Sequence, residues 1–490
     1  MISFILALAA LVCGYLFYGR FVERVFGPDD RPTPAVYKAD GVDYTVLPSW
    51  KIFMIQFLNI AGTGPIFGAI MGAKFGPAAY LWIVFGCIFG GAVHDYLSGM
   101  LSVRHGGANL PELVGTYLGG TTKKVMLVFS VFLLMMVGAV FVFSPAKILG
   151  GIWEPAFTVE HFGSYTFWIA VVFIYYIIAT MLPVDKIIGR IYPVFAVALI
   201  FMAISLMVVL FAKFPDIPEV WEGLGKTPGG ALTKNPIFPC LFISIACGAI
   251  SGFHATQSPL MARCMKHEKM GRPIFYGAMI TEGVVALIWA AVASYFFYGQ
   301  PDPAYKLIPG GAEAIGAAPS IVNLVCREWL GVFGGVLALL GVVAAPITSG
   351  DTALRSARLI IADFLKVEQK SVGRRLLICI PLFAAVFALL IWQMNDASGF
   401  EKIWSWFGWS NQALSVFTLW TLTVYLAREK KCFWVTFLPA LFMTWVCTTF
   451  LMYTPNAFGL KLPLAYGVGF AAVVAAIVWF AAWHRKSCVR

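Results

Sequence analysis

Long apolar runs separated by short polar segments repeat along the whole chain. Each run is near the roughly 20 residues that a helix needs to cross a bilayer, and none shows the ten-residue alternation of a membrane β-barrel. The pattern predicts an all-α polytopic membrane protein with about thirteen transmembrane helices. The expected spans are residues 2–19, 51–72, 78–101, 123–148, 165–183, 190–213, 236–257, 272–299, 329–358, 373–394, 403–427, 432–453 and 463–484.

Two of the expected spans contain helix-breaking residues near their middle. The second span carries Gly62, Gly64 and Pro65, and the seventh carries Gly248 and Gly252. Each glycine weakens a helix by about 1 kcal/mol, and proline removes a backbone donor and clashes with the preceding turn. Unwound backbone is tolerated in a membrane where it lines a polar cavity. Because glycine also lets helices pack closely, packing is the alternative explanation for either break alone.

The two broken spans stand at equivalent places in the chain. When the first span is set aside, the next ten divide into two groups of five, and each group begins with a broken span. Groups with an odd number of spans enter the membrane from opposite sides, as inverted repeats do. The sequence therefore predicts a LeuT-like 5+5 inverted-repeat core with one extra N-terminal helix and two extra C-terminal helices. The expected units are 1–50 for the extra helix and a cytoplasmic linker, 51–213 and 236–427 for the repeats, and 428–490 for the C-terminal helices and a cytoplasmic tail.

Composition and charge agree with a membrane location. Of the 490 residues, 60% are hydrophobic and 12% are charged, which excludes both an ordinary soluble globule and a disordered chain. With the N-terminus outside, about three quarters of the 35 lysines and arginines fall in cytoplasmic segments. This bias predicts a multi-pass protein of the plasma or inner membrane with an external N-terminus and a cytoplasmic C-terminus. Because the basic residues alternate with spans, the net charge of +11 does not indicate a nucleic-acid partner.

Several stretches in and around these spans are distinctive. They are Thr33–Ala35 with Asp40–Tyr44, Ile60–Pro65, Gly91–Tyr96, Leu182–Arg190 and Ile245–His254. Together they make the chain similar to the CstA (carbon starvation protein A) family, as a short form that lacks the C-terminal length of the best-known members. The resemblance implies secondary transport, since members are associated with uptake of peptides and, in one branch, of pyruvate with protons.

The two breaks are the expected substrate site. An unwound helix offers free amides and the positive end of a helix dipole to an anionic group, such as the carboxylate of pyruvate or of a short peptide. His254 either binds a carboxylate or caps a neighbouring carbonyl, and Asn411 and Gln412 either line the pathway or join neighbouring helices. The expected substrate-binding residues are Asn59, Ala61, Gly62, Thr63, Gly64, Gly248, Ala249, Ser251, Gly252, His254, Asn411 and Gln412.

Three ionisable residues inside spans are candidates for proton coupling. Asp95, His254 and Glu282 lie within apolar runs, where a charged group is costly and usually faces a cavity or a partner. Such a group suits a proton carrier. Structural pairing between helices is the alternative explanation.

A second set of residues is suited to sodium. In LeuT-like sodium symporters the eighth core helix supplies a Ser/Thr pair to the ion, and Thr348 and Ser349 in the ninth span are similar in character. Together with Asp351 and the carbonyl groups of the first break at Ile60 and Ala61, they form a candidate sodium site of hard oxygen ligands. Pairing of Asp351 with the arginine four residues later is the alternative.

These features favour a cation-coupled symporter that works by alternating access, with H+ or Na+ as the coupling ion and no cofactor. The alternatives are a sodium-coupled transporter of amino acids or other small metabolites, and a membrane sensor of carbon starvation that does not transport. An enzyme is not expected, because the 6 histidines and 10 cysteines form neither H-E-x-x-H nor C-x-x-C. A channel is not expected either, since no filter sequence is present.

Overall fold

The computed structural model of the chain describes residues 1–39, 44–153, 165–181, 184–224, 235–299, 318–367, 372–396 and 399–488. The regular structure in these ranges is helical throughout, which confirms an all-α fold.

The first half of the chain begins with one continuous helix in which a π-helical turn joins two α-helical parts. The bent helix of the first break and several long helices follow it. The elements are α1 (Ile2–Cys13), η1 (Gly14–Tyr18), α2 (Gly19–Phe26), α3 (Pro34–Tyr37), α4 (Ser49–Ile60), α5 (Thr63–Gly72), η2 (Ala73–Phe75), α6 (Ala78–Phe85), η3 (Gly86–Gly91), α7 (Ala92–Arg104), α8 (Leu110–Leu118), α9 (Gly120–Trp153), α10 (Tyr165–Met181) and α11 (Val184–Lys213).

The second half begins with the second broken helix and ends in four long helices. Its longest element, α16, extends beyond the predicted span at both ends and is kinked at Gly331, whose φ of 64° is open to glycine. The elements are η4 (Val220–Glu222), α12 (Ile237–Ser244), α13 (Gly252–Ala262), η5 (Glu268–Met270), η6 (Arg272–Tyr276), α14 (Gly277–Ser294), η7 (Tyr295–Gly299), α16 (Ala318–Leu365), α17 (Val372–Asn395), α18 (Gly399–Arg428), α19 (Trp434–Tyr453) and α20 (Leu462–Cys488).

Many of these helices are long and apolar enough to cross a membrane. Within the described residues 8 helices meet this condition, or 9 if α4 and α5 are counted as one bent span. A multi-pass membrane protein is therefore supported, whereas the total of thirteen spans stays a prediction.

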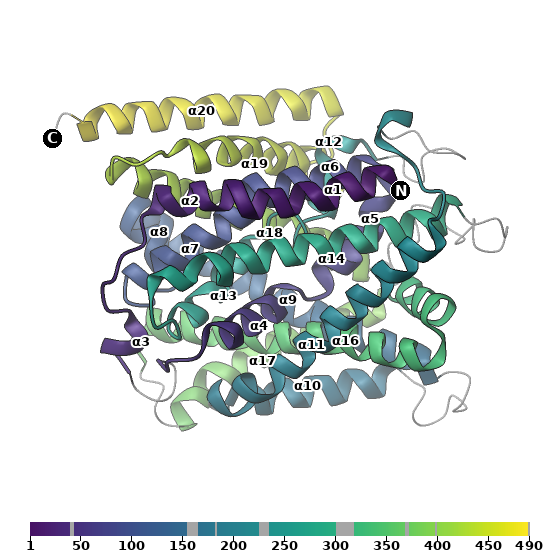
Figure 1. The fold of residues 1–490 in the computed structure, drawn as a ribbon. Helices are drawn as coiled ribbons and strands as arrows, with labels where there is room; N and C mark the ends of the chain where they lie inside the picture. Colours follow the sequence, from purple (N-terminus) through teal and green to yellow (C-terminus); the bar gives the residue numbers. More distant parts are fainter. Residues whose placement is uncertain are drawn as a thin grey trace.

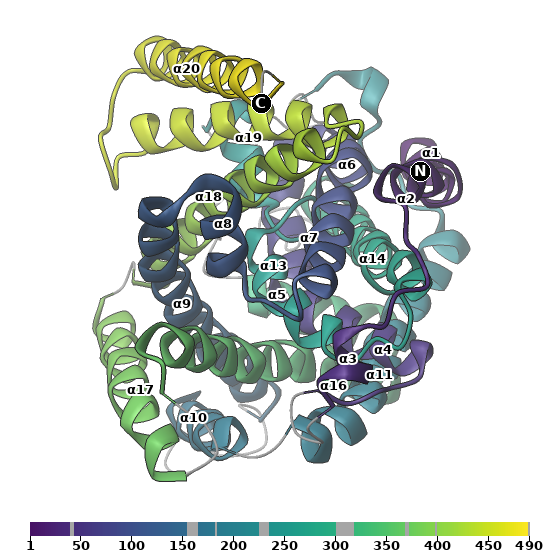
Figure 2. The ribbon, with the colours of Figure 1, turned by 90° about the vertical axis from the view of Figure 1, so that its left-hand side faces the viewer.

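The long helices run along a common direction, and the two termini lie at opposite ends of the bundle (Figure 1). Viewed along that direction, α5 and α13 lie in the middle, while α1, α10, α17, α19 and α20 lie at the periphery (Figure 2). Every residue of α5 and of α13 is buried. The two helices that follow the breaks thus occupy the centre of the molecule.

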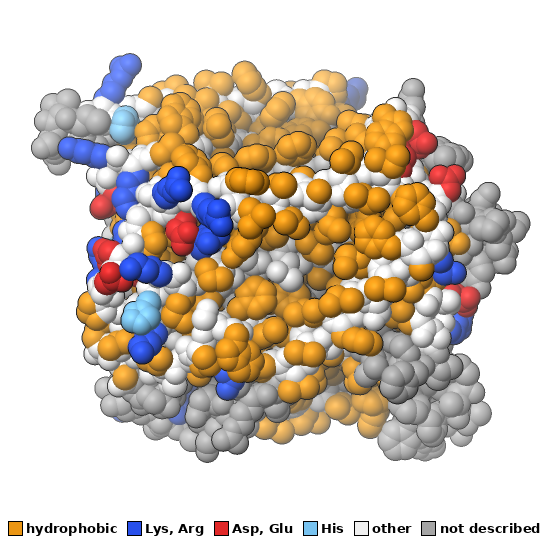
Figure 3. Space-filling model, in the orientation of Figure 1, with side chains coloured by type: hydrophobic (Ala, Val, Ile, Leu, Met, Phe, Trp, Pro, Cys, Tyr) orange, Lys and Arg blue, Asp and Glu red, His pale blue; other side chains and the backbone are white. Residues whose placement is uncertain are grey.

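The surface is divided into an apolar belt and charged ends. Figure 3 shows hydrophobic side chains across the middle of one face, with most of its lysines and arginines at the end that carries the C-terminus in Figure 1. Exposed side chains of the peripheral helices, such as Phe470 and Val478 on α20 and Phe387 on α17, belong to the apolar surface of the bundle. Such a surface is stable when lipid surrounds it.

Candidate functional site

The first break is short. Only Ala61 and Gly62 leave the helical conformation, and α4 and α5 meet there at an angle of 48°. The predicted break was longer, but α4 continues to Ile60 and α5 starts at Thr63. Pro65 is compatible with α5 because it lies in the first turn, where backbone amides have no intrahelical acceptor. The Gly62 amide turns back and donates to the Ile60 carbonyl over 2.9 Å.

The second break is longer than the first and begins earlier than predicted. It comprises residues 245–251, so that Gly252 is already the first residue of α13. The carbonyl oxygen of Ile245 accepts a hydrogen bond of 2.9 Å from the indole of Trp82 on α6. The amide of Ile250 donates to the Ala246 carbonyl over 2.9 Å. Part of the unwound backbone is therefore satisfied inside the protein, as an apolar surrounding requires.

Glycines bring the first turn of α5, directly after the first break, into contact with the second break. A Cβ atom added to Gly64 would lie 2.3 Å from Sγ of Cys247 in the other break. One added to Gly248 would lie 2.5 Å from Cβ of Ala286 on α14 and 3.7 Å from Cα of Pro65. Close packing, the alternative explanation for the glycines, is thus one of their roles. The first turn of α5 and the second break, 183 positions apart in the chain at Gly64 and Cys247, form one structural unit.

Asn411 on α18 joins this unit as a cap of α13. Its Oδ1 accepts hydrogen bonds from the Phe253 amide over 2.7 Å and from the Ser251 hydroxyl over 3.0 Å. Its Nδ2 lies 3.3 Å from Sγ of Cys247. The amide oxygen therefore occupies the place where a helix N-terminus would hold an anionic group. The side chain of the next residue, Gln412, does not join this cap and instead donates a hydrogen bond to the Phe242 carbonyl on α12.

Polar side chains without partners surround the first break. Both polar atoms of Gln56 and of Asn59 and the hydroxyl of Thr63 are fully buried and have no hydrogen-bond partner among the described residues. Gln56 and Asn59 are three residues apart on α4 and share one face of that helix. Burial of polar groups without partners is costly, so this position favours a polar ligand. Gln56 was not among the predicted residues, although its spacing from Asn59 was a readable signal.

The three predicted proton-coupling residues lie together. Nδ1 of His254 on α13 is 2.8 Å from Oδ2 of Asp95 on α7, and its Nε2 is 3.5 Å from Oε2 of Glu282 on α14. Nδ1 of His94 is 2.8 Å from Oδ1 of Asp95. All four side chains have no exposed surface. Pairing between helices, the alternative explanation for these residues, is thus present. His94 also belongs to this cluster, although it was not among the predicted residues.

The predicted sodium ligands separate into two places. The Ser349 hydroxyl donates to the Leu58 carbonyl over 3.1 Å and lies 3.2 Å from the position of a Cβ on Gly62, so it borders the first break. The Thr348 hydroxyl donates to the Ala344 carbonyl within its own helix. Only Ser349 of the two therefore reaches the carbonyl groups of α4.

Asp351 points to a different neighbour, α11. Its Oδ2 accepts a hydrogen bond of 2.9 Å from the Tyr192 hydroxyl, and its Oδ1 is 4.0 Å from the guanidinium of Arg355. The pairing with Arg355 is therefore at the limit of an ion pair. Within the described residues no three or more His, Cys, Asp or Glu side chains are arranged to hold a metal ion.

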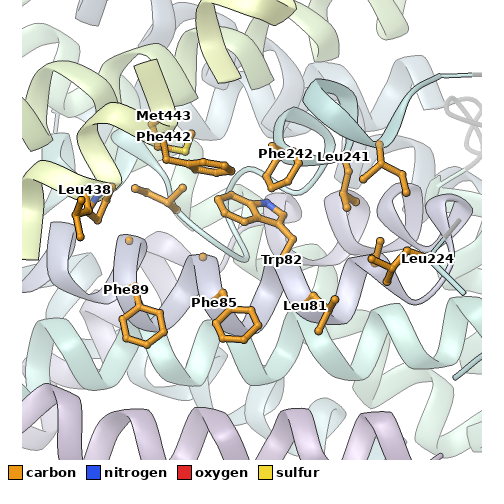
Figure 4. Close-up of a pocket in the computed structure, with 16 residues that line it drawn as sticks. Leu81, Trp82, Phe85, Phe89, Leu224, Leu241, Phe242, Leu438, Phe442 and Met443 are labelled. Carbon is orange, nitrogen blue, oxygen red and sulfur yellow. The ribbon is translucent and has the colours of Figure 1, made fainter. Parts of the chain in front are cut away.

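An apolar cavity of about 480 Å³ lies beside the second break, between α6, α12 and α19. Trp82, Phe242 and Phe442 meet at its wall, and Phe85 and Phe89 lie along η3 and the end of α6 (Figure 4). It touches the second break only at Ile250. None of the predicted site residues lines it, and Phe85 and Phe89 are exposed on the apolar surface.

The bundle of apolar helices with buried polar groups at two breaks defines a multi-pass membrane protein with an internal polar site. A family model described as "Carbon starvation protein CstA" matches residues 1–159, 142–300 and 306–450. The chain belongs to the CstA family.

Relatives of the chain include proteins named as transporters. An uncharacterized membrane protein of Haemophilus influenzae is 45% identical over 357 residues, covering 64% of this chain and 96% of the relative. The peptide transporter CstA of Bacillus subtilis is 27% identical and covers 84% of this chain and 82% of its own. The pyruvate/proton symporter BtsT of Escherichia coli is 25% identical, and the alignment covers 93% of this chain and 81% of the relative.

A solved structure shares the fold. The manganese transporter of Eremococcus coleocola, solved in complex with an aromatic bis-isothiourea substituted compound, aligns with a TM-score of 0.55 at 11% identity. The alignment covers 92% of this chain and 99% of that chain. At this identity the likeness shows the fold alone.

Proposed function

We propose that the protein is a cation-coupled symporter that imports a small carboxylate such as pyruvate, or short peptides, by alternating access. The observation that carries the proposal is the contact between the second break and the first turn of α5, directly after the first break, with unpartnered polar groups and four buried ionisable side chains next to it. The names of the peptide transporter and the pyruvate/proton symporter among the relatives support this class of substrate.

The proposed architecture is the LeuT-like 5+5 core within thirteen spans, with repeats at 51–213 and 236–427, the extra N-terminal helix at 1–50 and the two C-terminal helices at 428–490. An odd number of spans puts the termini on opposite sides, in agreement with their positions in Figure 1. The basic end of Figure 3 is the cytoplasmic one in this proposal, because positive residues collect on the cytoplasmic side. The N-terminus is then external and the C-terminus cytoplasmic, in the plasma or inner membrane.

The substrate binds between the breaks in this proposal, on the backbone of Ala61–Gly64 and Gly248–Gly252, with Asn59, Ser251 and Asn411 as hydrogen-bonding side chains. The Gly64 contact and the Asn411 cap close that space in the present conformation. A carboxylate that replaces the Asn411 oxygen at α13 would separate α18 from the second break, and this links binding to movement of the helices.

The coupling ion is a proton held by Asp95, His254 and Glu282, or sodium at Ile60, Ala61, Thr348, Ser349 and Asp351. The sodium version, with an amino acid or another small metabolite as substrate, is supported by the position of the Ser349 hydroxyl beside the first break. The proton version is supported by the assembled ionisable groups.

Uptake by the purified protein in liposomes tests the proposal. Labelled pyruvate, other short carboxylates and dialanine are offered under an imposed pH step without sodium, and under a sodium gradient at constant pH. We expect accumulation of at least one substrate above its external concentration under one gradient. If none of them accumulates under either gradient, while the same liposomes remain tight to protons, the proposal is wrong.

A further inference from the structure

The four buried ionisable side chains form a chain of contacts in a fixed order. His94 and His254 each approach a different oxygen of Asp95 through Nδ1, and His254 approaches Glu282 through Nε2. An ionised carboxylate only accepts hydrogen bonds, so both imidazoles carry a hydrogen on Nδ1 when Asp95 is ionised. This arrangement leaves Nε2 of His254 as the atom that faces Glu282.

The gap between His254 and Glu282 is stable only when it contains a proton. Without a proton in the gap, the lone pair of His254 Nε2 faces the ionised carboxylate of Glu282. The cluster then also contains two buried negative charges, on Asp95 and Glu282, and no positive charge to compensate them. With one, either Glu282 donates to Nε2 or the imidazolium pairs with Glu282. Both carboxylate oxygens of Glu282 and Nε2 of His254 are buried, and they have no other hydrogen-bond partner among the described residues.

Among the residues that the structure describes, no lysine or arginine forms an ion pair with any of the four side chains, whose ion pairs are with one another. The titratable groups near Glu282 include the thiols of Cys87 on η3 and Cys247 in the second break. Cysteine thiols are neutral near physiological pH in the absence of an activating charge. A proton is therefore the species that the cluster needs.

From this geometry we propose that the transported proton occupies the gap between Nε2 of His254 and Oε2 of Glu282, and that His94 is a positioning residue that holds Asp95 and thereby the His254 ring. The proposal rests on the proposed transport function and assigns its coupling ion. His254 is in the first turn of α13, directly after the second break. A proton in the gap thus joins α7, α13 and α14 at the point where the broken helix resumes.

Transport by a Glu282→Gln variant separates the proton site from transport itself. We expect this variant to lose accumulation driven by a pH step, down to the level of liposomes without protein, while exchange of labelled for unlabelled substrate at equal pH continues. Glu112→Gln, on the exposed surface of α8, is the matched control and should behave like the wild type. Accumulation by Glu282→Gln under a pH step equal to that of the wild type would overturn the assignment.

Infrared difference spectra of the purified protein test the proton site without any transport. Between alkaline and acidic buffer, the wild type should gain the carbonyl band of a protonated carboxyl group if Glu282 carries the proton, or an imidazolium ring band if His254 carries it, and this band should be missing from Glu282→Gln. An unchanged band in Glu282→Gln contradicts the proposal even if uptake is lost. If the wild type transports no substrate but shows the band, the proposed function fails and the proton site stands.

The role of His94 has its own readout. His94→Leu removes a hydrogen bond to Asp95, so the charge on Asp95 is less stabilised and the cluster should hold its proton to higher pH. We expect the infrared titration and the pH profile of uptake to move together to higher pH, and His94→Asn, whose amide can donate to Asp95, to restore them. If His94 has only a structural role, His94→Leu should lower the yield of folded protein without moving the pH profile. An unchanged pH profile in folded His94→Leu would overturn the positioning role of His94.

Discussion

At the scale of single residues, side chains from other helices satisfy the backbone groups that the breaks leave free. Asn411 caps α13 and holds the Ser251 hydroxyl, so it does for the second break what a carboxylate would do. The sequence indicated Asn411 as a polar residue in a core helix. It could not indicate the cap, because Asn411 and Phe253 are brought together by tertiary packing alone.

Asn411→Asp should separate stability from transport. The new carboxylate still accepts from Ser251 and Phe253 and is favourable at a helix N-terminus, so folding should be retained. It also competes with an anionic substrate, so pyruvate uptake should fall. Asn411→Ala should lose about 0.5–2 kcal/mol of stability with the cap. Thermal unfolding in detergent and liposome uptake measure both effects. Normal pyruvate uptake by Asn411→Asp would refute the proposed role of this position.

Glu219 gives a pH-dependent contact outside the spans. Its carboxylate accepts from the amides of Ile2 and Ser3 at 2.8 Å and 2.7 Å, and the Ser3 hydroxyl accepts from Val220. Burial acts to raise the pKa of Glu219, but hydrogen bonds from the N-terminal amine and from Ser3 outweigh it and hold the pKa below its ordinary value. A lowered pKa stabilises the fold above the unfolded value and stops doing so as the pH falls through the folded one.

We therefore expect Glu219→Gln to unfold at a lower temperature than the wild type at pH 7, with the difference shrinking as the pH falls below about 4. Differential scanning fluorimetry in detergent measures it. The control is Glu222→Gln, since the Glu222 carboxylate, within the described part of the chain, accepts a hydrogen bond from the Glu219 amide alone. A difference that grows with acidification would contradict the sign of the pKa shift.

At the scale of elements, the broken helices show how far the sequence could lead. Gly62, Gly64, Gly248 and Gly252 predicted two interrupted helices, and both are interrupted. The bounds of the breaks differed from the predicted ones. At the first break α5 already starts at Thr63, because Pro65 is tolerated in the first turn of a helix. His94 was missed because its importance comes from the contact of Asp95 with His254 on α13, which only the fold assembles. Gln56 was missed although its spacing from Asn59 on α4 could be read in the sequence.

Gly248→Ala tests whether the breaks depend on close approach. The added Cβ would lie 2.5 Å from Ala286, so α14 or the second break must move, at a cost of about 1–3 kcal/mol and with loss of uptake. Gly467→Ala on α20 is the matched control, because no atom lies within 4 Å of its added Cβ. Comparison of the two melting temperatures and uptake rates measures the effect. Equal behaviour of the two variants would show that the contact is dispensable.

At the scale of the whole molecule, composition and apolar runs were sufficient for an all-helical membrane protein, and the family match agrees with the resemblance in the sequence. The order of spans and the positions of two glycine pairs suggested a repeat, yet adjacency of the breaks required the fold. Substrate identity depends on the shape of a small internal site, and hydropathy carries no information about that shape.

The proposed mechanism requires that the substrate binds between the two broken helices. A density map of the protein in lipid nanodiscs, saturated with whichever of pyruvate or dialanine it accumulates, would show where the substrate lies. We predict density bounded by Gly62–Gly64 and Gly248–Gly252, with the Asn411 oxygen displaced from α13. Substrate density in the apolar cavity of Figure 4, with Gly64 still packed on Cys247 and Asn411 still capping α13, would contradict the account.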